Sequence, residues 1–112
     1  MYDSDAVVGD YVHWLVTNIS ENNVKNGINV ISYKGPVPPS KTGKHRYIFE
    51  LYHQWNKSSD IDIERNISIS NLRKILGINN ILYKIQFISE NESGGKSKKE
   101  DINFLYQSYQ LP

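Results

Sequence analysis

The sequence predicts a mainly β fold, built of antiparallel sheets with one or two short helices near the C-terminus. Two observations carry this prediction. Stretches rich in aromatic and β-branched residues recur through the first half of the chain, separated by polar or proline-rich segments. Helical spacing of apolar residues begins only after residue 69. Strands that precede helices in this way are typical of a β domain with helices at one end.

Length and composition limit the classes of protein to consider. The 112 residues predict one domain, 1–112, with a modest core. The net charge of +1 gives no large field for nucleic acid, and the absence of cysteine excludes disulfides, thiolate metal sites and a cysteine nucleophile. We see neither an apolar run long enough to span a membrane nor a secretory signal pattern. A soluble, cytoplasmic protein without a cofactor is therefore expected.

Three strands are predicted in the first half. Residues 10–18 are aromatic and β-branched, and alternation places His13, Leu15 and Thr17 on one face. Residues 28–34 form a short alternating strand. Residues 46–54 give the clearest alternating pattern of the chain.

Both helices and a strand are predicted in the second half of the chain. Residues 55–64 are a polar connection. Ser70 is predicted as the N-cap of a short helix that ends at Gly77. Further along we expect a strand at 81–88, a flexible Gly/Ser/Lys-rich loop at 89–99 and a closing helix at 101–109. The apolar stripe of the short helix is Leu72, Ile75 and Leu76.

The stretch "GPVPPSKTGKHRYIFELY" holds the candidate binding residues. Prolines make the loop at 35–43 rigid, and the strand after it supplies His45 and Tyr47, which are two apart and share a face. With His13, they would form a donor-rich hole suited to a phosphate or carboxylate. Such binding should strengthen as pH falls through the histidine pKa. A satisfied core residue is the alternative for His13, and no metal site is predicted because the histidines lack metal-ligand spacing.

Several stretches together resemble one known family. "YDSDAV", "YVHWLVTNI", "YKGPVPPSKTGKHRYIFELY" and "FLYQ" are similar, in order and spacing, to the phosphatidylethanolamine-binding proteins, also called Raf kinase inhibitor-like proteins. The family signatures are Asp-Pro-Asp-Ala-Pro, a His-Trp or His-Phe strand, and Gly-x-His-Arg-Tyr after a Gly-Pro-x-Pro-Pro loop. The resemblance covers nearly all of the chain.

The resemblance implies an anion-binding pocket and assigns its residues. Tyr106 matches a tyrosine of a C-terminal helix that closes the pocket, although helix core is an equally good interpretation. Alternation turns Arg46 away from His45, so we expect Arg46 to be structural and to pair with a carboxylate such as Asp5. The implied ligand-binding residues are Asp3, His13, Pro38, His45, Tyr47 and Tyr106, and the implied structural residues are Asp5, Gly35 and Arg46.

The chain also departs from the family pattern. Ser4 and Val7 replace the two prolines of the acidic motif, which predicts a looser turn there, and Val37 narrows the mouth of the pocket. The chain begins inside the acidic motif, so the usual N-terminal segment is expected to be missing. We expect the resulting exposed sheet edge to favour self-association, for example as a homodimer.

These observations favour a non-enzymatic binding module. Its ligand would be a phosphate or a phosphoethanolamine-type head group of a phospholipid, and its partner a signalling kinase or a serine protease, with no nucleic acid and no membrane span. One alternative is a remnant that binds no ligand and acts through protein contacts. Another is a hydrolase that uses His13 or His45 as a general base.

Overall fold

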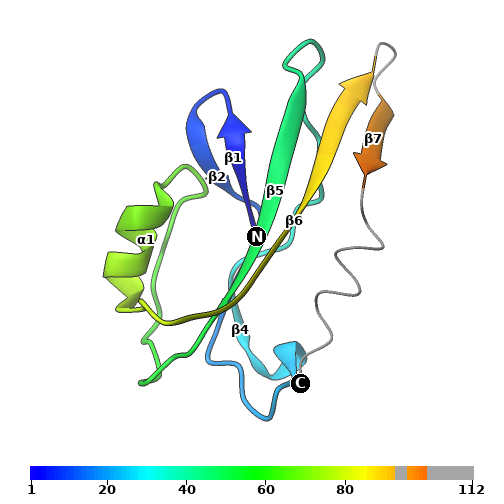
Figure 1. Cartoon of the computed structure of the whole chain (residues 1–112). Helices are drawn as coiled ribbons and strands as arrows, with labels where there is room; N and C mark the ends of the chain where they lie inside the picture. The colour runs from blue at the N-terminus through cyan, green and yellow to red at the C-terminus, as the bar shows by residue number, and fades with distance from the viewer. Residues whose placement is uncertain (93–95, 101–112) are drawn as a thin grey trace.

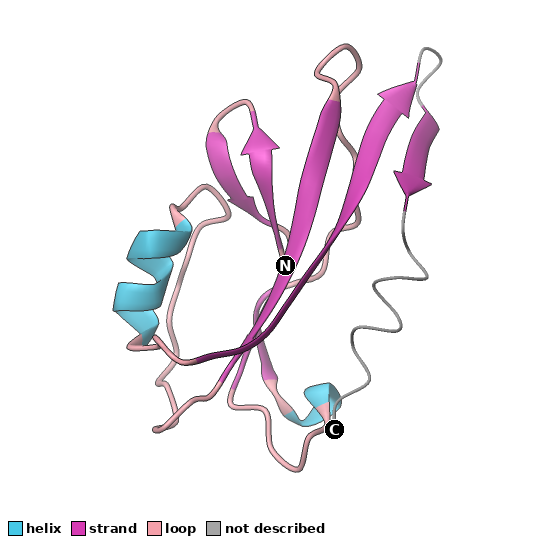
Figure 2. Ribbon diagram, in the orientation of Figure 1, coloured by secondary structure: helices cyan, strands magenta, loops and turns pink. Residues whose placement is uncertain are grey.

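The structure is a computed structural model that describes residues 1–92 and 96–100. It consists of a five-stranded sheet, a two-stranded sheet and one α-helix (Figure 1), and strands predominate (Figure 2). All strand pairs are antiparallel. The predicted mainly β fold with antiparallel sheets is confirmed. In the described part of the chain, no helix is long and apolar enough to cross a membrane.

The larger sheet has the strand order β2-β1-β5-β6-β7, and the smaller one pairs β3 with β4. A short 3-10 helix, η1, precedes β4 and was not predicted. The elements in chain order are β1 (Tyr2–Ala6), β2 (Gly9–Val12), β3 (Leu15–Thr17), η1 (Val24–Asn26), β4 (Ile28–Ile31), β5 (Lys44–Tyr52), α1 (Ile69–Leu76), β6 (Ile81–Glu92) and β7 (Lys96–Glu100).

The register divides the large sheet into two faces. Tyr2 pairs with both Val12 and Ile48, so these three side chains share one face. Asp3 pairs with Tyr11 and Tyr47, which places these residues on the other face. The first face packs against α1 and forms the core. The buried core residues are Tyr2, Val12, Ile31, Ile48, Ile69 and Leu72.

Helix α1 is fixed at both ends. The Ser68 side chain caps its N-terminus by accepting from Asn71 N, and Gly77 ends it in the left-handed conformation with φ 64°. The end at Gly77 is as predicted, whereas the predicted N-cap Ser70 is wrong because Ser70 lies inside the helix. The predicted stripe is also partly wrong, since Ile75 is 54% exposed.

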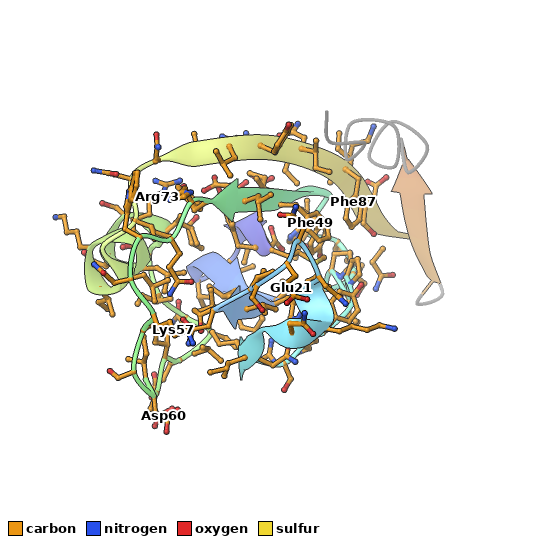
Figure 3. All side chains as sticks on the ribbon, turned by 90° about the horizontal axis from the view of Figure 1, so that it is seen from below. Glu21, Phe49, Lys57, Asp60, Arg73 and Phe87 are labelled. Carbon is orange, nitrogen blue, oxygen red and sulfur yellow. The ribbon has the colours of Figure 1, made fainter. Side chains whose placement is uncertain are left out.

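A polar cluster holds α1 to β5. Arg73 donates to both carboxylate oxygens of Glu50, at 2.8 and 3.1 Å, and to the hydroxyl of Tyr52 at 2.6 Å. Tyr2 and Tyr52 each donate to Glu50. Figure 3 shows Arg73 on α1, on the opposite side of the view from Phe49 and Phe87. The Glu50 carboxylate is therefore fully engaged in fastening the helix.

The predicted strand at 10–18 is in fact two strands in different sheets. The backbone N–H groups of His13 and Trp14 both donate to the carbonyl of Met1, at 2.8 and 3.1 Å. These bonds turn the chain out of β2 before it enters β3. Residues 2–6, expected to form a turn, are strand β1, because Tyr2 and Asp3 are hydrogen-bonded between β2 and β5.

The other predicted boundaries shift by a few residues. The strand predicted at 28–34 ends at Ile31, and the one predicted at 46–54 runs over Lys44–Tyr52. The loop predicted at 89–99 is wrong in part, since β6 continues to Glu92 and pairs with β7. The helix predicted at 101–109 lies outside the described residues.

Candidate functional site

The centre of the candidate site is a contact between neighbouring strands. His45 lies near the start of β5, and its Nδ1 donates to Asp3 Oδ2 on β1 at 2.7 Å. The side chains of His45 and Asp3 are 1% and 5% exposed. The second oxygen of Asp3 accepts from Asp5 N at 2.8 Å. The carboxylate of Asp3 is thus held on both oxygens and orients the imidazole of His45.

Thr42 forms a hydrogen bond with the other ring nitrogen of His45. The hydroxyl of Thr42 lies 2.6 Å from the carbonyl of Pro39 and 2.7 Å from His45 Nε2. A carbonyl can only accept, so the single hydroxyl proton goes to Pro39, and Thr42 Oγ1 accepts from Nε2–H. The hydrogen-bond network thus assigns both ring nitrogens of His45 as donors, Nδ1 to Asp3 and Nε2 to Thr42.

His13 lies at the end of β2, facing the same site. Its Nδ1 is 2.7 Å from the carbonyl of Lys34 and must be the donor. Burial lowers the pKa of His13 below its ordinary value of 6.5, opposed by the bond to Lys34 and by the charge of Asp3. Within the described residues no hydrogen bond is formed by His13 Nε2. In the neutral ring, this nitrogen presents a lone pair to the site.

Arg65 fixes the turn that carries His13. The Arg65 carbonyl accepts from Val12 N at 2.7 Å, and its guanidinium donates to the carbonyls of Val12 and His13 at 3.1 and 3.3 Å. It also donates to the carbonyl of Ser32 at 2.9 Å. One side chain thus ties the end of β2 to the beginning of the proline loop.

Tyr47 is the buried aromatic residue at the base of the site. It is 1% exposed, its ring stacks on Phe87 at a centroid distance of 5.3 Å, and it meets the edge of His13 at 5.1 Å. Figure 3 shows Phe87 next to Phe49, on the side of β5 and β6 toward η1. Burial and the negative charge of Asp3 raise the pKa of Tyr47, so that it remains a phenol at physiological pH.

The proline loop forms a wall over the site face of β6. Pro38 is almost fully buried, and its carbonyl accepts from Asn91 Nδ2 at 2.9 Å. Lys41 and Gly43, at φ 63° and 77°, make the turn that points Thr42 at His45. Figure 1 shows this teal segment running beside β5 before it enters the strand. The loop therefore contacts both β5 and β6.

Arg46 and Asp5 form the ion pair expected from alternation. Arg46 Nε and Nη2 each donate to one oxygen of Asp5 at 2.9 Å, and Arg46 N donates to the same carboxylate at 2.8 Å. The hydrogen bonds from Arg46 lower the pKa of Asp5. This two-pronged pair fastens β1 to β5 next to Asp3 and His45.

Comparison with known proteins decides the family. The family model described as phosphatidylethanolamine-binding protein matches residues 1–88. The chain belongs to this family. It is 42% identical over 65 residues to the "Putative lipoprotein LppC" of Mycobacterium tuberculosis, covering 46% of this chain and 32% of that protein.

Two further relatives have other names. A "26 kDa secreted antigen" of Toxocara canis is 39% identical over 46 residues, covering 41% of this chain and 18% of the antigen. A "Putative odorant-binding protein A5" of Drosophila melanogaster is 36% identical over 61 residues, covering 54% of this chain and 28% of that protein. The chain thus spans about a third or less of the length of each of these relatives.

This member of the phosphatidylethanolamine-binding family brings most of the residues predicted for the site together. Direct contacts join His45 to Asp3 and Tyr47 to His13. Pro38 is buried in the loop above them. Gly35 shows no steric need for glycine, since an added Cβ would meet only Tyr33 at 3.8 Å. Tyr106 lies outside the described residues.

Three residues of the site were missed by sequence reasoning: Thr42, Ser89 and Asn91. Alternation in β6 could have indicated Ser89 and Asn91, which share a face with Phe87. The composition of residues 89–99 instead predicts a loop. Thr42 gave no signal, since its contact depends on the shape of the turn. Among the described residues, no group of three or more potential ligands could hold a metal ion.

Proposed function

We propose that this protein is a non-enzymatic binding module for phosphate-bearing ligands, such as a phosphoethanolamine-type head group of a phospholipid. The observation that carries the proposal is the convergence of His13, His45, Tyr47 and Asp3 on one face of the sheet. Two imidazoles and a phenol are strong donors for an anion. Membership of the phosphatidylethanolamine-binding family supports a ligand of this chemistry.

Each donor would reach the anion by a different route. Tyr47 keeps its proton, and an anion oxygen would replace Asp3 as the acceptor of its hydroxyl. Neutral His13 presents a lone pair at Nε2, so it must first take up a proton before it can bind an anion there. His45 Nε2 already carries a proton, which it donates in a hydrogen bond to Thr42. An anion oxygen would therefore replace Thr42 Oγ1 as the acceptor. Binding is therefore coupled to proton uptake and to movement of the turn at Thr42.

The test is a titration with phosphate and with phosphoethanolamine, followed by the imidazole NMR signals at one pH above and one below 6.5. We expect His13 and His45 to shift together and saturably, with tighter binding at the lower pH. His53 is the internal control, because it is exposed and its ring contacts Trp55 edge-to-face rather than any residue of the site. If neither His13 nor His45 shifts in the folded protein, the chain is instead a remnant that acts through protein contacts.

We propose further that the bound state modulates a signalling kinase or a serine protease. The loop that carries Pro38 also exposes apolar side chains beside the site, with Tyr33 57% and Val37 67% exposed. A partner that docks there would sense whether the site is filled. The measurement is inhibition of a panel of kinases and serine proteases, with and without phosphoethanolamine. Inhibition unchanged by Val37→Lys would count against this surface.

A hydrolase is the second candidate, because Thr42, His45 and Asp3 form a chain of hydrogen bonds in the order nucleophile, base and carboxylate. The hydrolase ranks second because His45 Nε2 donates to Thr42 and so cannot accept its proton as a base. The Thr42 hydroxyl donates to the carbonyl of Pro39 instead. Turnover of p-nitrophenyl phosphate or acetate that is lost in both Thr42→Ala and His45→Gln would favour the hydrolase over the binding module.

A cytoplasmic location stays our prediction from composition, and a secreted one is the alternative suggested by the names of two relatives. The two compartments predict different chemistry at the four Asn-x-Ser sequons. Asn56 and Asn66 are exposed, whereas the side chains of Asn18 and Asn91 are engaged in hydrogen bonds. Glycans confined to Asn56 and Asn66 in the native protein would establish secretion.

A further inference from the structure

Strand β6 carries two buried polar atoms that have no hydrogen-bond partner among the described residues, Ser89 Oγ and Asn91 Oδ1. Ser89 is 0% exposed. Buried polar groups in native proteins are almost always hydrogen-bonded, and each exception calls for an explanation such as a ligand. Two further unpartnered hydroxyls, Ser4 and Ser58, lie on other segments.

Both atoms lie on the face of the candidate site. Ser89 is the cross-strand neighbour of His45, so their side chains share one face. Asn91 lies two residues further on the same face, and its amide nitrogen reaches the carbonyl of Pro38. The unpartnered oxygens are therefore bounded by His45 on one side and by the proline loop on the other.

We propose that Ser89 and Asn91 are specificity-determining residues, which accept hydrogen bonds from a donor group that the ligand carries beside its phosphate. This inference rests on the proposed phosphate-binding function. The amide oxygen of Asn91 can only accept, and its amide nitrogen already donates to the carbonyl of Pro38. An oxygen of this kind repels a phosphate and binds a hydroxyl or an ammonium group. The ligand class is thus a phosphate monoester with a nearby hydroxyl or ammonium group.

The phosphate and the donor group would occupy different parts of the site. The donors for an anion are His13, which directly follows β2, and Tyr47 on β5. The acceptors come from β6, on the other side of His45 from Asp3. This division selects ligands that are anionic at one end and donate hydrogen bonds at the other.

The test compares three probes on the wild-type protein and on Ser89→Ala: methyl phosphate, which has no second donor, glycerol 3-phosphate, which offers hydroxyls, and phosphoethanolamine, which offers an ammonium group. We expect Ser89→Ala to lose about tenfold in affinity for at least one donor-bearing probe, since a ligand donor is left unpaired. Affinity for methyl phosphate should not change. The probe that loses affinity identifies hydroxyl or ammonium as the natural donor.

Thermal unfolding separates this role from a structural one. Because no described residue forms a hydrogen bond with the Ser89 hydroxyl, Ser89→Ala should keep or raise the melting temperature. Ser4→Ala is the matched control: it also removes an unpartnered buried hydroxyl, on β1, and should leave the ranking of the three probes unchanged.

The outcomes distinguish a failure of the role proposed for Ser89 from a failure of phosphate binding itself. Equal effects of Ser89→Ala on all three probes, no effect on any, or a fall in melting temperature would each overturn the role of Ser89 while leaving phosphate binding intact. If the wild-type protein binds none of the three probes, the proposed function fails, and the inference fails with it.

Discussion

Asp3 and His45 form a buried hydrogen-bonded pair, with 2.7 Å between Oδ2 and Nδ1, and both side chains are at most 5% exposed. The pair joins two adjacent strands. Thr42 and Asp5 N complete the hydrogen bonds around it. The pair therefore serves both to hold β1 against β5 and to fix the orientation of the imidazole at the candidate site.

Removing one partner of this pair should be costly. We expect Asp3→Ala to lower the free energy of unfolding by about 1–3 kcal/mol, because it leaves the buried Nδ1–H of His45 without its hydrogen-bond acceptor. Urea denaturation measures the change. Asp62→Ala, at an exposed position, is the control and should have little effect. A loss no larger than that of the control would show that the pair contributes nothing to stability.

The pH dependence of stability should report on His13. Burial lowers its pKa in the folded state below the ordinary value of 6.5, so the unfolded chain binds the proton more readily than the folded one. The contribution of His13 to stability is therefore full above pH 6.5 and is lost as pH falls through 6.5 toward the folded pKa. Chemical denaturation across this range should show the fall, and His13→Gln should remove it, whereas His53→Gln should not.

Phosphate should reverse this loss. An anion at Nε2 favours protonated His13, so the stabilisation by phosphate should grow as pH falls below 6.5. Melting curves with and without phosphate at several pH values measure it. A stabilisation that is independent of pH, or the same in His13→Gln, would place the anion elsewhere on the protein.

Thr42 competes with a ligand for His45. In the free protein its hydroxyl accepts from Nε2 at 2.7 Å, where an anion oxygen would otherwise bind. Thr42→Ala should therefore strengthen phosphate binding about three- to tenfold, the value of one hydrogen bond that no longer has to be broken. Isothermal titration measures the affinity, and Thr42→Ser, which keeps the hydroxyl, is the control. Weaker binding by Thr42→Ala would mean that Thr42 itself contacts the anion.

The sequence predicts this site better than it predicts the strand boundaries. The spacing of His45 and Tyr47 places both on one face, since alternation is a local property of a strand. Alternation also predicts the separation of Arg46 from His45, and the Arg46–Asp5 pair follows from it. The facing of these side chains needs no knowledge of which strands are neighbours, whereas the choice of Asp5 as partner depends on the pairing of β1 with β5.

Features that depend on tertiary contacts were mostly missed. The break between β2 and β3 is made by hydrogen bonds from His13 and Trp14 to the distant Met1 carbonyl, and nothing in the local pattern of residues 10–18 indicates it. Polar composition made residues 89–92 appear to be a loop, yet pairing with β5 and β7 makes them strand. Tertiary pairing overrides local propensity in both cases.

The smaller sheet should be the site of self-association. Within the described residues, β3 and β4 pair only with each other, so each leaves one edge open. The large sheet is better protected, because Arg65 covers Val12 on β2 and β7 contains three lysines in the sequence Lys-Ser-Lys-Lys-Glu. Ile28 on β4 is 48% exposed, which adds an apolar contact to the open edge.

A charge at this edge should therefore abolish association. We expect light scattering to show a concentration-dependent dimer for the wild-type protein and a monomer for Ile28→Lys, because strands that carry lysine resist edge-to-edge pairing. Val7→Lys is the control: Val7 is 80% exposed but lies in the turn between β1 and β2, away from the small sheet. A wild-type protein that stays monomeric at all concentrations and melts cooperatively would show that the open edge of β4 has no partner in a second copy.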